Sequence, residues 1–337
     1  MNEAPVAGTL DWLNMSPPSW KPSIWETHLN ACKTPPKKID IINTSEDLKF
    51  SEKYKYKKLS KYIGLLGSTR MVAPFTYVGV EIELEHCNMH SNIPSTWNKV
   101  EDNSLKLDGM EYVTRPIQVK YLEVELLRLF NGVRGSKPTS RCSVHIHLNV
   151  RDFTLVELEK FLILYLIFER SLYRISGDRW CNNFCVPLYN YPVLIKSTLH
   201  NLSKGVFNEE WYKYHGLNIS PIFGGESSKL GTIEFRHLRG TKDIGLILLW
   251  INLIVSLKIA AKRLDVVHLE QLALHINDVS DYNNLSDRVF QVHSNAIKNQ
   301  PTFKEDMEMC IAQLKYCLFK CEEGGSVEIP ITKQGVR

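Results

Sequence analysis

Three short motifs in this sequence combine acidic, histidine and arginine side chains in an alternating pattern. They are Glu81-Ile82-Glu83, His145-Ile146-His147 and Glu234-Phe235-Arg236. In each motif polar residues flank an apolar one, which is the period of a β-strand and places both polar side chains on one face. Carboxylates, imidazoles and a guanidinium on a shared face have the composition of a site that binds a hard metal ion together with an anionic phosphate.

The types of candidate ligand favour magnesium or manganese over zinc. Most of them are carboxylates, namely Glu81, Glu83, Glu111 and Glu234. Oxygen donors suit Mg²⁺ or Mn²⁺, and one or two imidazoles are compatible with both, whereas zinc prefers more His and Cys. Carboxylates that face one another repel strongly unless cations lie between them. Any one motif alone is also typical of a solvent-exposed strand, so it is their joint occurrence that indicates a site.

Arg236 adds a phosphate-binding group to this face. It follows Glu234 by two residues, so the two side chains point the same way from a strand. A guanidinium can bind phosphate oxygens in a bidentate manner. With a divalent cation on a concave sheet it would neutralise a nucleoside triphosphate, which predicts phosphoryl transfer by positioning and charge stabilisation. The sequence contains neither a GxxxxGK(S/T) phosphate loop nor a GxSxG elbow.

The elements that must position these residues follow from periodicity and capping signals. Strands are expected at about 76–86, 107–117, 142–150 and 229–239. Helices are expected at about 122–133, 154–176 and 242–263, the second beginning with a capping box from Thr154 to Glu157. The strands are polar on one face and apolar on the other. This predicts an α+β fold in which helices cover the apolar side of an antiparallel or mixed sheet and leave the polar face open.

Composition divides the 337 residues into three parts. Residues 1–72 are predicted to be an N-terminal extension, 73–264 the catalytic core, and 265–337 a helical region with two or three helices and a short tail. In the extension, Lys53–Lys61 interleaves lysine with tyrosine, a pattern found both in surfaces that bind nucleic acid and in solvated helices. The small net charge of +4 favours the solvated helix, so no specific nucleic-acid partner is expected.

The composition also predicts a cytoplasmic protein. The eight cysteines are scattered and lack paired CxxC motifs, which argues against a zinc ribbon and fits reduced thiols. The N-terminal sequence lacks the charged and apolar regions of a secretion signal. The uncharged run 244–257 is shorter than the roughly 20 apolar residues of a membrane span, so it predicts a buried core helix and no membrane partner.

In their order and spacing, the motifs resemble the amidoligase family of the glutamine synthetase-like carboxylate–amine ligase superfamily. The resemblance extends from residue 76 to about residue 250 and includes, besides the three motifs, Trp97, Glu101-Asp102-Asn103-Ser104-Leu105, Glu111-Tyr112-Val113-Thr114-Arg115-Pro116, Ser140 to His147 and Leu217-Asn218. It implies a curved, mainly antiparallel sheet whose concave face holds ATP and divalent metals, with helices behind the sheet. Asn103 and Ser143 stand where the family often has glycine, but neither change removes a proposed ligand.

The resemblance also implies a role for each site residue. The metal ligands would be Glu81, Glu83, Glu111, His145 and Glu234. His147 would contact the nucleotide or its phosphates, and Arg236 would clamp the transition state. Asp102 and Ser104 would line a substrate or nucleotide rim, while Arg115 would bind an acidic group of the substrate. Glu81, Glu83, Glu234 and Arg236 would be the catalytic residues, with ATP and Mg²⁺ or Mn²⁺ as cofactors.

The activity implied by the resemblance is the ATP-dependent joining of a carboxylate to an amine. The carboxylate would attack the γ-phosphate to form an acyl phosphate, which the amine would then displace while a site carboxylate accepts its proton. The carboxylate and amine could belong to small molecules, peptides or proteins, and the oligomeric state stays open. The family is often phage-encoded, which would place the protein in the host cytoplasm. Two alternatives stay open: a non-catalytic phage structural or assembly protein that retains the fold, and a metal-dependent hydrolase.

Overall fold

The computed structural model describes residues 76–88, 92–177, 179–205, 211–223, 230–264 and 278–319, together with residues 269, 273, 275 and 276. The predicted N-terminal extension 1–72, with its Lys53–Lys61 segment, and the predicted C-terminal tail lie outside the described residues.

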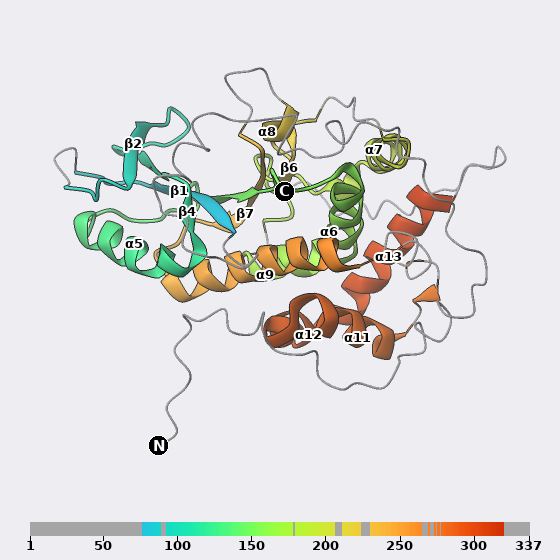
Figure 1. Ribbon diagram of the computed structural model, residues 1–337. Helices are drawn as coiled ribbons and strands as arrows, with labels where there is room; N and C mark the ends of the chain where they lie inside the picture. Colours follow the sequence, from blue (N-terminus) through green and yellow to red (C-terminus); the bar gives the residue numbers. More distant parts are fainter. Residues whose placement is uncertain are drawn as a thin grey trace.

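The centre of the fold is a seven-stranded sheet. Its strands are β1 (Tyr77–Leu84), β2 (Trp97–Glu101), β3 (Met110–Thr114), β4 (Ile117–Gln118), β5 (Ser143–Asn149), β6 (Leu217–Asn218) and β7 (Thr232–Arg239). They lie in the order β2-β3-β1-β5-β7-β6, with β4 paired to β1. Each of these strand pairs is antiparallel. The three motifs of the sequence therefore occupy three adjacent central strands, β1, β5 and β7 (Figure 1).

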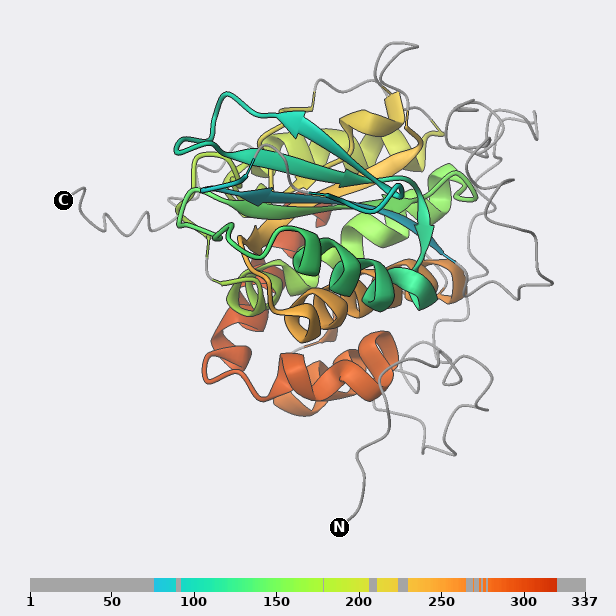
Figure 2. The ribbon, with the colours of Figure 1, turned by 90° about the vertical axis from the view of Figure 1, so that its left-hand side faces the viewer.

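The α-helices are α5 (Val119–Gly132), α6 (Leu155–Ile175), α7 (Pro192–Ser203), α8 (Ser220–Phe223), α9 (Ile244–Arg263), α11 (Val279–Phe290), α12 (Ser294–Lys298) and α13 (Phe303–Phe319). Helices α5, α6 and α9 contact the sheet, and the C-terminal helices pack on them. Figure 2 shows α5 and α9 beneath the sheet and the C-terminal helices α11 and α12 in a further layer below them. Helix α6 begins with the predicted capping box, in which the Thr154 hydroxyl accepts from the Glu157 N–H and the Glu157 carboxylate accepts from the Thr154 N–H.

The apolar face of the sheet and the covering helices form one hydrophobic core. Val80 and Ile82 of β1 alternate with the polar residues of that strand and are fully buried. Phe235 of β7 packs edge-on against Trp250 of α9, with ring centroids 6.2 Å apart. Each such side chain contributes about 1.5–3 kcal/mol to folding by burial. The alternation that directs the acids and histidines to one face therefore also fixes the strands against the helices.

Helix α9 is the predicted core helix. By length and composition it could also cross a membrane, but 61% of its most apolar 18-residue window is buried inside the protein. It packs against α5, α6, α11 and β5. Its N-terminus is capped by the Asp243 side chain, which accepts from the Leu246 N–H at 3.0 Å.

The predicted α+β class and mainly antiparallel sheet are confirmed, and the predicted strands and helices are present with slightly shifted ends. Four elements lie outside the predicted ranges: the edge strand β2, the two-residue strand β6 and helices α7 and α8; the strand expected at 107–117 is divided into β3 and β4. Most of β2 is exposed, so it lacks the alternation of buried and exposed residues on which the prediction depends. A two-residue strand is too short to show a period at all.

Candidate functional site

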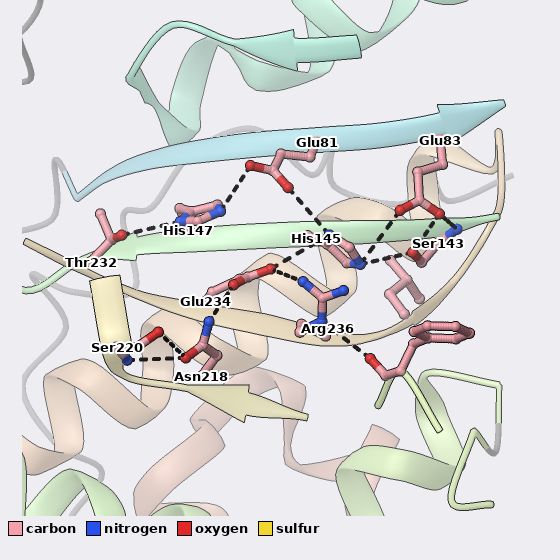
Figure 3. Close-up of polar contacts among 12 residues, drawn as sticks. Glu81, Glu83, Ser143, His145, His147, Asn218, Ser220, Thr232, Glu234 and Arg236 are labelled. Atoms are coloured by element: carbon pink, nitrogen blue, oxygen red, sulfur yellow. Dashed lines mark hydrogen bonds and ion pairs between the residues drawn. The ribbon is translucent and has the colours of Figure 1, made fainter. Parts of the chain in front are cut away.

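The register of the sheet brings the three motifs together on its polar face. Glu81 of β1 pairs with His145 of β5, and His147 of β5 pairs with Glu234 of β7. Residues directly opposite each other in antiparallel strands point to the same face and lie close together. Side chains from residues separated by more than 150 positions in the chain therefore meet on three adjacent strands (Figure 3).

Arg236 lies on the same face, two residues after Glu234 and at the start of a β-bulge. The register between β5 and β7 shifts between Val144 and Ile146, so Arg236 and His237 together oppose the single residue His145. A bulge of this kind re-aims the side chains around it. His237 and the following Leu238 are both fully buried in the core, whereas the Arg236 guanidinium contacts Glu234 on the polar face.

Glu81 lies between the two imidazoles of β5. Its Oε1 is 3.0 Å from His147 Nε2, and its Oε2 is 3.2 Å from His145 Nδ1. Burial would raise the pKa of Glu81, but the charge of His147 and hydrogen bonds from both imidazoles lower it well below its ordinary value. Burial would likewise lower the pKa of His147, yet Glu81 raises it to about 9. At neutral pH this pair therefore consists of a carboxylate and a protonated imidazole.

Glu111 is the carboxylate whose charge the neighbouring residues do not compensate. Burial, followed by the negative charges of Glu81, Glu83 and Asp102, raises its pKa to about 8. At neutral pH Glu111 therefore carries a proton unless a cation takes the place of that proton. A cluster of acids of this kind becomes favourable once it binds a divalent cation.

Two groups of side chains offer ligand atoms close enough to hold a metal ion. One consists of Glu81, Glu111 and His145, and the other of Glu81, His147 and Glu234; the ligand atoms in each lie within 4.8 Å of one another. Their oxygen-rich composition suits Mg²⁺ or Mn²⁺. Four of the five predicted metal ligands belong to these groups. His147, predicted to contact nucleotide, lies at a position that could also ligate metal.

Glu83, the fifth predicted ligand, has a different environment. Its Oε2 accepts hydrogen bonds from the backbone N–H and the hydroxyl of Ser143, both at 2.7 Å. The Ser143 hydroxyl in turn lies 2.8 Å from His145 Nε2. Glu83 Oε1 lies 3.8 Å from the same imidazole nitrogen. Glu83 thus orients His145 through Ser143, and its second oxygen still faces the cluster.

Glu234 is held from both sides. Its Oε2 accepts from the Asn218 amide of β6 at 2.7 Å, and its Oε1 accepts from the Arg236 guanidinium. The same Oε1 lies 3.5 Å from His145 Nδ1. Burial would raise the pKa of Glu234, but the charges of the two imidazoles and of Arg236 lower it. Glu234 is therefore ionised and fixed in orientation.

The two predicted rim residues, Asp102 and Ser104, lie in the loop between β2 and β3, and Arg115, predicted to bind an acidic group of the substrate, follows β3. The Asp102 carboxylate accepts from the Ser104 backbone N–H at 2.8 Å in the loop between β2 and β3. Its charge contributes to the raised pKa of Glu111, which places it beside the acidic cluster. Ser104 is exposed in this loop, and Arg115 is exposed immediately after β3. The Arg115 backbone N–H donates to the Thr96 carbonyl at 2.9 Å.

The structure adds residues to which the sequence assigned no role. Thr232 Oγ1 lies 3.1 Å from His147 Nδ1, and Ser143 and Asn218 hold Glu83 and Glu234. Ser143 lies two residues before His145 and Thr232 two residues before Glu234, so the same two-residue period, which puts them on the same face, could have identified them. Asn218 lies on the very short strand β6, where no local period is available.

The arrangement can hold a divalent cation beside a fixed guanidinium. The acids are partly open to solvent at Glu81, whose side chain is 22% exposed, so a ligand could reach them. Positive charge from Arg236 and His147 lies on the same face and suits an anionic ligand. Models of known protein families do not match the chain, and neither does any curated protein with which it was compared.

Proposed function

We propose that this protein is an ATP-dependent carboxylate–amine ligase with a glutamine synthetase-like catalytic fold. One observation carries the proposal: the acids, imidazoles and arginine of the three motifs meet on one face of an antiparallel sheet whose other face is covered by helices. Phosphoryl transfer to a carboxylate brings two anions together. A face that combines cation ligands with a fixed arginine supplies the charge stabilisation which that step requires.

The donor set fits Mg²⁺ or Mn²⁺. The raised pKa of Glu111 supports this fit, because a carboxylate that is protonated at neutral pH among other acids is one that a cation would stabilise. Glu81, Glu111, His145 and Glu234 would hold the ion, with Glu83 as a further oxygen donor. When bound, the ion would neutralise phosphate oxygens and reduce the repulsion between nucleophile and triphosphate.

Arg236 would bind the phosphoryl group as it is transferred. Its guanidinium is already held by Glu234, and its Nε donates to the Phe184 carbonyl at 3.1 Å. A donor fixed before the reaction costs little reorganisation during it. His147, held between Glu81 and Thr232, would donate to a phosphate oxygen or serve as a further ligand. Arg115, exposed immediately after β3, would bind an acidic group of the substrate.

The proposed reaction has two steps. A carboxylate oxygen of the substrate forms a bond to the γ-phosphorus of ATP, and ADP leaves with the electrons of the broken bond. The amine nitrogen then attacks the acyl carbon of the acyl phosphate, and phosphate leaves. The proton lost by the amine passes to a carboxylate of the site.

The test is nucleotide turnover with defined substrates. Purified protein with Mg²⁺ or Mn²⁺, ATP and panels of carboxylates and amines should release ADP and phosphate, and hydroxylamine should trap the acyl phosphate as a hydroxamate. Glu234→Ala should abolish both products without unfolding the protein, while Glu308→Ala, on the exposed side of α13, should leave both unchanged.

Other outcomes would favour the alternatives. If calorimetry detects no binding of Mg²⁺ with a non-hydrolysable ATP analogue, the ligase proposal is wrong. Hydrolysis that requires only the metal would instead support a hydrolase. Retention of activity in Glu234→Ala would show that the site has been assigned to the wrong residues.

A further inference from the structure

Arg179 binds the strand segment that carries Arg236. It lies in the loop after α6, and its Nη1 is 3.1 Å from the carbonyl oxygen of Arg236 and 3.4 Å from that of Leu238. These two carbonyls flank His237, the residue through which the bulge of β7 is formed. A single guanidinium therefore spans the bulge.

The segment 236–238 lies where the pairing of β7 with its neighbouring strands is irregular, although Leu238 still pairs with Val144 of β5. On one side, the pairing of β6 with β7 involves Glu234 and Phe235. The Arg236 N–H then donates to the backbone carbonyl of Gly216, the residue before β6. On the other side lies the register shift with β5. Buried backbone carbonyls without partners cost free energy, so they need donors from elsewhere. Arg179 adds a side-chain donor to two of the carbonyls in this irregular segment.

The same loop holds the Arg236 side chain. The Arg236 Nε donates to the carbonyl of Phe184 at 3.1 Å. Two successive turns link Phe184 to Arg179. In the first, the Asn182 N–H donates to the Arg179 backbone carbonyl at 2.9 Å, and in the second the Cys185 N–H donates to the Asn182 backbone carbonyl at 3.0 Å. The backbone and the guanidinium of Arg236 are therefore both tied to one short segment that begins at Arg179.

We propose that Arg179 is a positioning residue that fixes the bulge of β7 and thereby keeps the Arg236 guanidinium on the carboxylate face. Its guanidinium donates to backbone carbonyls of β7. An arginine suits this role because its rigid planar fork binds two acceptors at once, which a lysine ammonium on a flexible chain does less well.

The electrostatics of the bulge agree with this placement. Burial, and to a smaller extent the positive charge of Arg179, lowers the pKa of His237 to about 3. His237 is thus neutral at physiological pH, and Arg179 is the charged group beside it. His237 consequently adds no positive charge that would repel Arg179 from the carbonyls it binds.

The first arm of the test is structural and independent of any activity. Crystal structures of Arg179→Met and Arg179→Lys should show the Arg236 guanidinium displaced from Glu234, while Arg174→Met should leave it in place. Arg174 is a matched control because it is an arginine five residues earlier whose guanidinium bonds Asp306 of α13. If Arg236 keeps its position in both Arg179 variants, the inference is wrong. If one of the two Arg179 variants does not fold, the structure of the other still gives the answer.

The second arm measures affinity for Mg²⁺ with a non-hydrolysable ATP analogue, and this arm rests on the proposed function. Arg179→Met should weaken binding roughly tenfold, as Arg236→Met does, and the double variant should lose little more, because both changes remove the same contact. Additive losses would contradict the coupling. If the wild-type protein binds no nucleotide while Arg236 is displaced in the Arg179 variants, the positioning role stands and the proposed function fails.

Discussion

Glu83 of β1 and Glu111 of β3 are directly paired across two antiparallel strands. Two acids in this relationship normally destabilise a sheet, because like charges opposite each other repel. Burial first, then the charge of Glu81 and, to a smaller extent, that of Glu83 raise the pKa of Glu111 to about 8. The sheet tolerates the pair by keeping a proton there, and a divalent cation could replace that proton.

Metal binding should therefore release protons at neutral pH. Because the pKa of Glu111 lies above 7, the residue is protonated before a cation binds and ionised afterwards. Calorimetric titration with Mn²⁺ at pH 7, in two buffers of different ionisation enthalpy, should report this release. The affinity should rise with pH and level off above about 8. Glu111→Gln should abolish the release, and Glu308→Gln should not; a titration without proton release in the wild type would contradict the assignment.

Removing the Ser143 hydroxyl should weaken the site without destroying it. Ser143→Ala loses the hydrogen bonds to Glu83 and His145 but keeps the backbone N–H that Glu83 accepts. We expect the free energy of unfolding to fall by about 1 kcal/mol and the affinity for Mn²⁺ to fall roughly threefold to tenfold, since such partners orient ligands. Thermal unfolding and calorimetry measure the two effects. Ser203→Ala is the control, because its hydroxyl bonds an exposed helical carbonyl far along the chain. Equal metal affinity in both variants would contradict the orienting role.

The motifs were predictable because their chemistry coincides with a local period. Glu81 and Glu83 alternate with buried Val80 and Ile82, so the sequence alone indicates both the strand and its polar face. The same argument applies to the two histidines of β5. Which strands are neighbours did not follow from the period, yet that order decides that Glu81 meets His145.

The contribution of the loops could not be predicted from local patterns. Arg179 donates to the backbone carbonyl of Arg236, and the backbone carbonyl of Phe184 accepts from the Arg236 side chain. Since every residue has a backbone carbonyl, residue type does not indicate such contacts. The bulge at His237 is equally hidden, because it depends on the register of β7 against β5. Sequence therefore indicated which groups could do chemistry, whereas the supporting residues emerged only from the three-dimensional arrangement.

Asp306 should link the C-terminal helix α13 to α6 in a pH-dependent way. Burial would raise its pKa, but hydrogen bonds from Arg170, Thr302 and Arg174 lower it below the ordinary value of 3.8. A lowered folded-state pKa contributes stability that is fully present above 3.8 and is lost as the pH falls through the folded value. Asp306→Asn should lower the free energy of unfolding by about 1–3 kcal/mol at pH 7. The difference from wild type should shrink below pH 3.8; denaturant unfolding at several pH values checks this, and a difference independent of pH would contradict it.

His237 should make the protein less stable in mild acid. Its pKa is lowered from 6.5 to about 3 by burial and, to a smaller extent, by Arg179. Above pH 6.5 the residue is neutral in both states, and below it the unfolded chain gains a proton that the folded protein cannot accept until about pH 3. The free energy of unfolding should therefore fall by up to about 1.4 kcal/mol per pH unit within this window on account of this residue. In His237→Gln, whose amide can still bond the Tyr165 hydroxyl that lies 2.8 Å from the imidazole, that part of the slope should vanish. His215, whose pKa burial lowers to about 4, contributes a slope of the same sign to both proteins and cancels in the comparison. The free energy of unfolding of wild type and His237→Gln should be measured by denaturant unfolding between pH 4 and 6.5. Equal slopes with pH in the two proteins would mean that His237 accepts a proton in the folded state, which would contradict its lowered pKa.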